Sequence, residues 1–144
     1  MAEREKSMMI NAPIDQVYNL WTNIQNFPKL LNHIKDVSVK SPSQSHWKVE
    51  LAGVPMEFDA QITDMQENKR LAWKSISGVN NSGFINFEEM PQGTRITVHF
   101  NYAPETLPEQ FTGQLGAGQQ AEKDIEEDLN NLKSNIEKGI AMAA

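Results

Sequence analysis

The sequence predicts an α+β domain in which a curved, seven-stranded antiparallel sheet packs against one long C-terminal helix. Apolar and polar residues alternate along six segments between residues 37 and 102, which is typical of strands with one dry and one wet face. Apolar residues then recur every three or four positions from Ile125 to Ile140, which is the period of an amphipathic helix. A short apolar run near the N-terminus supplies the seventh strand.

The N-terminal segment predicts this first strand and two short helices between strands 1 and 2. The strand is expected at residues 8–10. Pro13 suits the first position of a helix, where the missing N–H of proline would have no helical partner. The apolar face of this helix has the spacing i, i+3, i+4, i+7: Ile14, Val17, Tyr18 and Trp21. Pro28 forbids its continuation, so residues 26–34 form a break and a second short helix.

Six further strands follow, separated by turn-forming sequences. Their apolar positions are Val37 and Val39; Trp47, Val49 and Leu51; Val54, Met56, Phe58, Ala60 and Ile62; Leu71 and Trp73, in a run ending at Ser75; Ile85 and Phe87; and Ile96, Val98, Phe100 and Tyr102. The segments between them, such as residues 52–55, 78–83 and 91–94, carry Gly, Pro, Asn or Ser. Several are short enough for β-hairpins, so consecutive strands are expected to pair antiparallel.

A long amphipathic helix ends the chain. Its apolar stripe consists of Ile125, Leu129, Leu132, Ile136 and Ile140, and Leu107, Phe111 and Leu115 are expected to extend it toward the helix start. Three glycines in this approach, Gly113, Gly116 and Gly118, each cost about 1 kcal/mol relative to Ala within a helix. They predict a bend or hinge there. Since neither an internal repeat nor a linker interrupts the pattern, one domain spanning residues 1–144 is expected.

Residues 116–121, GAGQQA, match the G-x-G-x-x-A spacing of a dinucleotide-binding turn. Such a turn needs a strand before it, and after its helix a second strand followed by an acidic residue that holds the ribose. The preceding residues do not read as a strand, and no strand follows the last helix. The motif is therefore interpreted as a loosened helix start, and neither NAD, FAD nor any other cofactor is expected.

Composition narrows the functional class further. The 144 residues carry a formal net charge of −6 and contain no cysteine. The negative charge disfavours binding to nucleic acids and to anionic membrane surfaces. The lack of cysteine removes disulfides, thiolate nucleophiles and Cys-ligated metals. No signal-peptide pattern and no apolar stretch of transmembrane length occurs, so a soluble, cytoplasmic protein without stable membrane insertion is expected.

Several strings stand in a fixed order along about residues 7 to 103: INAPIDQVYNLWTNIQNFPKLLNHIKDV, HWKVE, FDAQIT, RLAWKSISG, SGFINFEE and GTRITV. Together with the C-terminal helix they resemble the START-related (SRPBCC) superfamily with its helix-grip fold. More narrowly, they resemble its polyketide cyclase/dehydrase branch, which includes coenzyme-Q-binding START-like proteins. The resemblance implies a cavity between sheet and helix that holds a lipid, an isoprenoid or quinone, or a polyketide-like molecule. It does not specify an activity, because the members bind very different ligands.

The expected ligand-binding residues lie on the dry face of the sheet or near the start of the last helix. They are Trp47, Met56, Phe58, Trp73, Ser75, Phe87, Phe100, Tyr102, Phe111 and Leu115. Large aromatic and Met side chains suit the walls of apolar ligand sites. The same residues would serve equally well as ordinary core, so both interpretations stay open for each of them.

Few residues suggest chemistry. His46 and His99 fall on wet strand positions, and His33 follows the second short helix, near the expected cavity mouth. No H-x-x-x-H motif or His–carboxylate cluster is evident, so no metal is expected. Tyr102 is the one weak catalytic candidate, since its hydroxyl could donate a hydrogen bond to a substrate held in a shaped cavity.

Three functions therefore remain open, and the first is favoured. In the first, the protein is a carrier or sensor of an apolar small molecule and catalyses no reaction. Alternatively, it is a metal-free cyclase or dehydratase acting on a polyketide-like or aromatic substrate, with Tyr102 required for turnover but not for binding. Thirdly, it is a protein-interaction or chaperone-type module for an unknown partner, with an exposed apolar patch around Phe27, Leu30 and Leu31.

Overall fold

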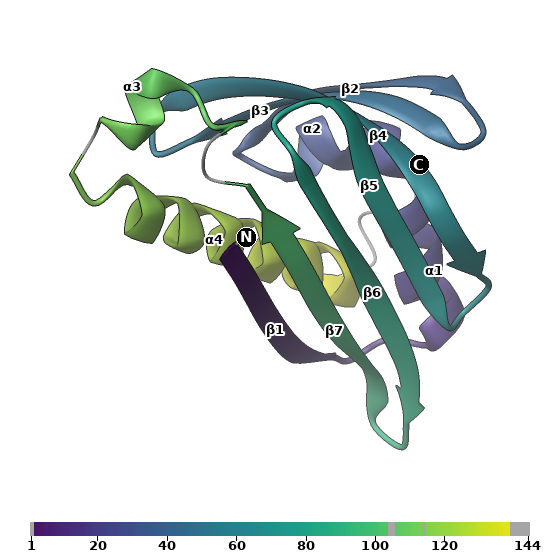
Figure 1. Ribbon diagram of the computed structural model, residues 1–144. Helices are drawn as coiled ribbons and strands as arrows, with labels where there is room; N and C mark the ends of the chain where they lie inside the picture. The colour runs from purple at the N-terminus through teal and green to yellow at the C-terminus, as the bar shows by residue number, and fades with distance from the viewer. Residues whose placement is uncertain (1, 104–105, 114, 139–144) are drawn as a thin grey trace.

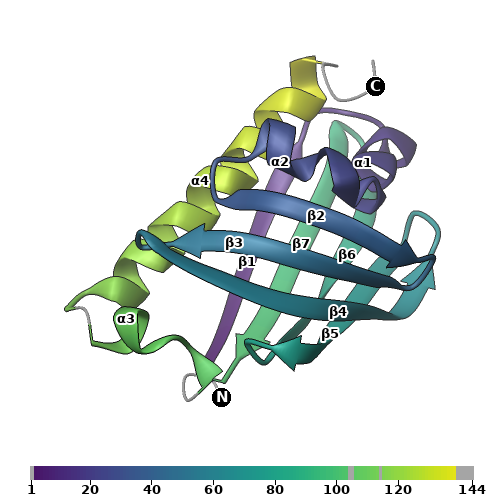
Figure 2. The same ribbon diagram turned by 90° about the horizontal axis from the view of Figure 1, so that it is seen from above.

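The computed structural model describes residues 2–103, 106–113 and 115–138. Within them, seven strands form one antiparallel sheet that curves around the helix α4, as Figures 1 and 2 show. The elements are β1 (Ala2–Ile10), α1 (Ile14–Thr22), η1 (Ile24–Asn26, a 3₁₀ turn), α2 (Phe27–Leu30), β2 (Ile34–Ser41), β3 (Gln44–Leu51), β4 (Val54–Gln66), β5 (Arg70–Gly78), β6 (Asn81–Met90), β7 (Gly93–Tyr102), α3 (Glu109–Thr112) and α4 (Ala117–Lys138). The α+β architecture predicted from the two hydrophobic periods is confirmed.

The strand order in the sheet is β1-β7-β6-β5-β4-β3-β2. Strands β2 to β7 are therefore a succession of hairpins, as their short turns predict. The β3–β4 turn has positive φ at Ala52 (53°) and Gly53 (77°), the combination that a tight two-residue hairpin with primed geometry requires. β1 instead pairs with β7, in a register that runs from Ala2 opposite Tyr102 to Ile10 opposite Thr94.

β1 is longer than the apolar run at residues 8–10 predicts. It begins at Ala2, and its first residues are charged rather than apolar. Arg4 forms an ion pair with Glu122 of α4, and the Nζ of Lys6 lies 3.0 Å from a carboxylate oxygen of Glu126. The hydrophobic pattern could not reveal the N-terminal end of β1, because Arg4 and Lys6 contact α4 through ion pairs rather than through apolar surface.

The helices largely follow the sequence signals. Pro13 precedes α1 as its N-cap residue, so the helix begins one residue later than expected, at Ile14. Pro28 lies in the first turn of α2, immediately after the 3₁₀ turn that separates it from α1. The predicted glycine interruption is also present, because α3 ends at Thr112 and α4 begins only at Ala117, after Gly116 with φ 78°.

The apolar stripe of the last helix is divided by this interruption. Leu107 and Phe111 pack with the small cluster that includes Val54 and Met56. Leu115 is fully exposed, so the prediction that it extends the buried stripe is wrong. The stripe's periodicity fails there because Gly113, Leu115 and Gly116 belong to neither helix. Ile140, the last predicted stripe residue, lies outside the described residues.

Most buried apolar residues form one core, to which α1, the sheet and the C-terminal half of α4 all contribute. Leu129, Leu132 and Ile136 are the contribution of α4 to this core. The N-terminal half of α4 contributes the small buried residues Ala117 and Ala121 to the smaller second cluster, and its partly buried Ile125 packs against the main core. This half of the helix therefore buries little apolar surface, and polar contacts on both of its flanks hold it against the sheet.

The apolar patch that would mark an interaction module is not on the surface. Phe27 is 4% exposed and Leu31 is 5% exposed, and Leu30 is half-buried against the core. The ring of Phe27 packs on Trp21 and Trp47, with centroid distances of 6.3 and 5.9 Å. The prediction of an exposed patch is wrong because the short helix α2 turns its apolar side inward.

In the parts of the chain that the structure describes, none of the helices is both long enough and apolar enough to cross a membrane.

Candidate functional site

A cavity of about 280 Å³ lies between the concave side of the sheet and α4. Its walls are mainly aromatic and aliphatic side chains from all parts of the fold. The aromatic residues that line it are Trp21, Phe27, Trp47, Phe58, Trp73, Phe100, Tyr102 and Phe111. A concave, largely apolar site of this kind, with few polar groups, is typical of small-molecule binding sites.

The cavity brings together seven of the ten residues that the sequence predicts for ligand binding: Trp47, Met56, Phe58, Trp73, Phe100, Tyr102 and Phe111. The other three do not line it. Phe87 is 6% exposed and packs edge-on against Tyr18 of α1, with a centroid distance of 5.2 Å. Ser75 accepts a hydrogen bond from the backbone N–H of Asn81 (2.9 Å), and Leu115 is exposed to solvent.

Two of the tryptophans are held in place by hydrogen bonds from their indole N–H groups. Trp47 donates to the hydroxyl of Ser45 (2.8 Å), and Trp73 donates to the side-chain oxygen of Asn81 (3.0 Å). Trp47 also stacks on Phe58, with the two rings 5° from parallel and 6.0 Å apart. These contacts occupy the polar atoms of the two indoles, so what they offer a bound molecule is mostly apolar ring surface.

Polar groups on the cavity wall lie in two places. At one, Arg4 and Glu122 form their ion pair, and Tyr102 and Asn81 lie on the neighbouring strands β7 and β6. The hydrogen bond and charge of Glu122 raise the pKa of Arg4. At the other, His33, the residue before β2, faces Asp128 of α4.

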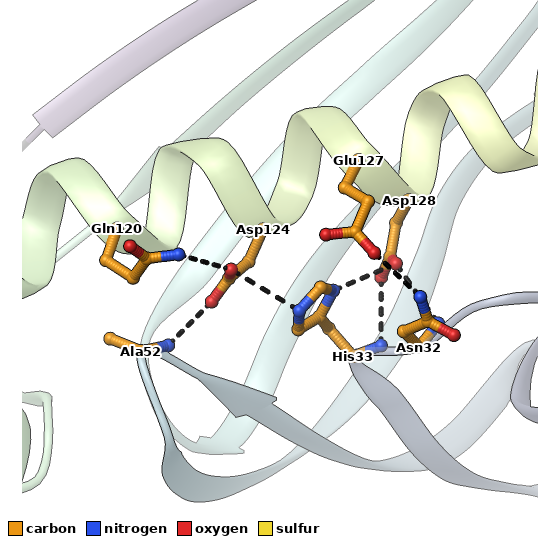
Figure 3. A network of polar contacts seen from close by, with 7 residues as sticks. All are labelled: Asn32, His33, Ala52, Gln120, Asp124, Glu127 and Asp128. Carbon is orange, nitrogen blue, oxygen red and sulfur yellow. Dashed lines mark hydrogen bonds and ion pairs between the residues drawn. The ribbon is translucent and has the colours of Figure 1, made fainter.

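His33 lies between two aspartates of α4 (Figure 3). Its Nε2 is 3.3 Å from Oδ1 of Asp124, and its Nδ1 is 2.9 Å from Oδ1 of Asp128. Asp128 also accepts hydrogen bonds from the backbone N–H groups of Asn32 (3.1 Å) and His33 (3.3 Å). The Asn32 side-chain amide donates to Glu127 (2.7 Å). The segment before β2 is thereby attached to the middle of α4.

Asp124 continues this network toward the β3–β4 turn. Its Oδ2 accepts a hydrogen bond from the backbone N–H of Ala52 (2.8 Å), and its Oδ1 accepts one from the Gln120 amide (2.9 Å). Burial by itself raises the pKa of Asp124. The hydrogen bonds from Ala52 and Gln120 and the nearby charge of His33 outweigh this effect, so the pKa is lowered and the carboxylate form is favoured.

The expectation that the chain has no His–carboxylate cluster is therefore wrong. A helical spacing of four places Gln120, Asp124 and Asp128 in one row on α4, and the fold brings His33 to that row from a distant part of the sequence. The sequence carried one indication of this row: Asp124 and Asp128 each directly precede a residue of the apolar stripe, which places them beside the buried face of the helix. In the structure both residues are at most 7% exposed.

The other two histidines lie away from the cavity, as their strand positions predict. His99 stacks on Phe84 with a centroid distance of 5.0 Å. His46 pairs directly across from Asp59 on β4, with its Nδ1 2.6 Å from the carboxylate and its Nε2 3.1 Å from Glu57. These hydrogen bonds, the one to Asp59 first, raise the pKa of His46. The hydrogen bond from His46, followed by those from Ser77 and Lys40, lowers the pKa of Asp59 to about 2.

We expect this surface pair to stabilise the fold most between about pH 4 and pH 6.5. Above pH 6.5, as the pH rises through the raised pKa of His46, the imidazolium loses its proton and the contribution fades. Below pH 3.8, as the pH falls toward 2, Asp59 gains a proton and the contribution fades again. The difference in free energy of unfolding between the natural protein and His46→Gln, measured with urea across this range, should therefore be bell-shaped. A difference independent of pH contradicts this account.

Comparisons with known proteins agree with the fold. Residues 10–123 match the family model described as polyketide cyclase/dehydrase and lipid transport. A curated relative from Streptomyces lincolnensis, an uncharacterized 17.2 kDa protein in the melC2-rnhH intergenic region, is 26% identical over 140 residues. The match covers 96% of this chain and 91% of the relative.

Solved structures share the architecture over nearly the whole chain. A Deinococcus radiodurans protein is 25% identical with a TM-score of 0.71, covering 96% of this chain and 99% of its own. The Zhui aromatase/cyclase from Streptomyces sp. R1128 is 14% identical with a TM-score of 0.76, covering 96% and 95%. A START superfamily protein from Mycobacterium smegmatis is 16% identical with a TM-score of 0.71, covering 99% of both chains. The START-like fold that the sequence strings predict is thus confirmed.

Proposed function

This chain belongs to the polyketide cyclase/dehydrase and lipid transport family, and from that premise we propose that it binds an apolar small molecule between the sheet and α4, as a carrier or sensor. The observation that carries the proposal is the cavity of about 280 Å³ with its aromatic walls. Removing apolar surface from water stabilises a complex by about 25 cal/mol per Å², so a molecule enclosed by these walls gains most of its affinity from burial. Lipids, isoprenoid quinones and polyketide-like ring systems have this character.

A second function, cyclisation or dehydration of a polyketide-like or aromatic substrate, is favoured by one observation. Tyr102, His33 and Asp128 line the same cavity, so groups that can donate a hydrogen bond or move a proton lie within reach of a bound molecule. The two functions differ in what happens to the molecule. A carrier releases its ligand unchanged, whereas an enzyme of this class releases a cyclised or dehydrated product.

The binding proposal is tested by filling the cavity from α4. Ala121 is 8% exposed and lines the cavity, so the ring in Ala121→Phe occupies space that a ligand would need. With 1-aminoanthracene as a fluorescent apolar probe, we expect the natural protein to bind and Ala121→Phe to bind roughly tenfold more weakly or worse. Lys123→Phe adds the same ring at an exposed position of the same helix and should bind like the natural protein.

Two further measurements complete this test. Circular dichroism and thermal unfolding establish that Ala121→Phe is folded, so that lost binding reflects the filled cavity. Native mass spectrometry of the purified protein, beside an extract of the denatured protein, reports any molecule bound in a one-to-one ratio. A natural protein that neither binds the probe nor carries an apolar molecule contradicts the proposed function.

A further inference from the structure

We propose that His33, Asp124 and Glu127 form a binding site for a divalent transition-metal ion of the Zn²⁺ type. The donor atoms of these three residues all lie within 4.8 Å of one another. His33 comes from the segment before β2, and the two acidic residues come from adjacent turns of α4 (Figure 3). Imidazole nitrogen and carboxylate oxygen are ligands that Zn²⁺ prefers, and three protein ligands leave a fourth tetrahedral position open. His33 also lines the apolar cavity, but the proposed metal site does not require that an apolar molecule binds there.

The first argument is the distance between two of the donors. Nε2 of His33 lies 3.3 Å from Oδ1 of Asp124. Two ligands that each bind Zn²⁺ at about 2.0–2.1 Å, in tetrahedral geometry, are roughly 3.3–3.4 Å apart. These two atoms therefore already have the separation that a shared ion would impose. Glu127 is exposed, so its side chain can rotate to complete the set without disturbing the core.

The second argument is that outer partners orient each ligand. His33 directs its other nitrogen, Nδ1, to Asp128 at 2.9 Å, which is the carboxylate–histidine arrangement found behind metal-binding histidines. With the proton on Nδ1, the lone pair of Nε2 is available to an ion. Asp124 is held by the Ala52 N–H and the Gln120 amide, and Glu127 accepts a hydrogen bond from the Asn32 amide.

The third argument is charge. Three carboxylates, those of Asp124, Glu127 and Asp128, lie around one imidazole, and both aspartates are buried residues. Among the residues described, the His33 ring is the one basic group within ion-pair distance of Asp124 and Asp128. A divalent cation bound at Nε2 would offset more of this negative charge than the single proton of an imidazolium can.

The competing arrangement is a metal-free clamp, in which a protonated His33 donates one hydrogen bond to each aspartate. The chain contains a useful comparison for it. His46 also contacts a carboxylate through each ring nitrogen, Asp59 at 2.6 Å and Glu57 at 3.1 Å, but within the described chain these three residues are not a group whose donor atoms all lie within 4.8 Å of one another. His46 therefore serves as a control for histidine–carboxylate contacts that do not converge on one point.

The experiment is a calorimetric titration of chelator-treated protein with Zn²⁺, repeated with Co²⁺, whose visible absorption reports tetrahedral coordination. We expect one Zn²⁺ per chain, with His46→Gln binding like the natural protein. Glu127→Gln, which changes only an exposed side chain, should weaken binding by roughly 10-fold or more, and His33→Ala should abolish it. Thermal unfolding without metal establishes that both variants are folded.

Two results would overturn the site. One is the absence of one-to-one Zn²⁺ binding by the natural protein, which leaves the metal-free clamp as the role of His33. The other is binding that Glu127→Gln and His33→Ala retain at full strength, which places the ion elsewhere. Neither result bears on 1-aminoanthracene binding, so the metal site and the apolar cavity succeed or fail separately.

Discussion

Replacing Asp128 with alanine is expected to lower the free energy of unfolding by about 3 kcal/mol. Asp128 is 7% exposed, and its carboxylate receives hydrogen bonds from the backbone N–H groups of Asn32 and His33 as well as from the His33 ring. Asp128→Ala leaves these donors without a partner in a largely buried place, and each unmet donor costs about 1–3 kcal/mol. Urea unfolding at neutral pH, followed by circular dichroism, measures the loss.

Glu126→Ala is the matched control for Asp128→Ala. Glu126 lies on the same helix and pairs with Lys6 at 3.0 Å, but both side chains are well exposed. Exposed ion pairs contribute about 0–1 kcal/mol, so this variant should remain close to the natural protein. Equal losses in the two variants would show that burial does not distinguish the two contacts, and would remove Asp128 as an anchor of α4.

Leu132→Ala is expected to cost about 2–5 kcal/mol and to enlarge the cavity. Leu132 is 2% exposed, belongs to the main core and also lines the cavity wall, so its truncation removes packing and adds empty volume at once. Ile125→Ala, at a half-buried cavity position one to two turns earlier, should cost less.

Urea unfolding measures the free energy of unfolding of Leu132→Ala and of Ile125→Ala. Binding of 1-aminoanthracene reports whether the enlarged cavity still accepts an apolar ring. A cost for Leu132→Ala no greater than that for Ile125→Ala contradicts the expectation that the more deeply buried of the two residues contributes more to stability. Probe binding by a folded Leu132→Ala protein is expected to persist, because truncation opens space rather than filling it.

The strands and the last helix were predictable because each repeats one short-range pattern. Alternation identifies which side chains share a face of the sheet, and this placed Trp47, Phe58, Trp73 and Phe100 together on the cavity wall. Alternation does not say what covers each part of that face. Phe87 lies on the covered part, under Tyr18 of α1, and is therefore core rather than wall.

The polar network was not predictable in the same way. It depends on where the segment before β2 meets α4, which is a property of the folded chain and leaves no repeat in the sequence. His33 and Asp128 are 95 positions apart, yet their side chains are 2.9 Å from each other. The burial of Phe27 and Leu31 was not predictable from a repeating pattern either. The helix α2 has only four residues, which is too short for a helical period to identify its buried face.

The pairing of β1 with β7 has a consequence for biosynthesis. β1 leaves the ribosome before the other six strands of the sheet, but its partner residues, 94–102, are made almost a hundred residues later. At about 5–20 residues per second, β1 waits roughly 5–20 s for its neighbour β7, while the hairpins from β2 to β6 can already pair in order. Closing so long a loop costs chain entropy that local hairpins avoid, so the pairing of β1 with β7 is expected to be the last strand pairing to form. The first strand to be synthesised is thus a late element to be folded.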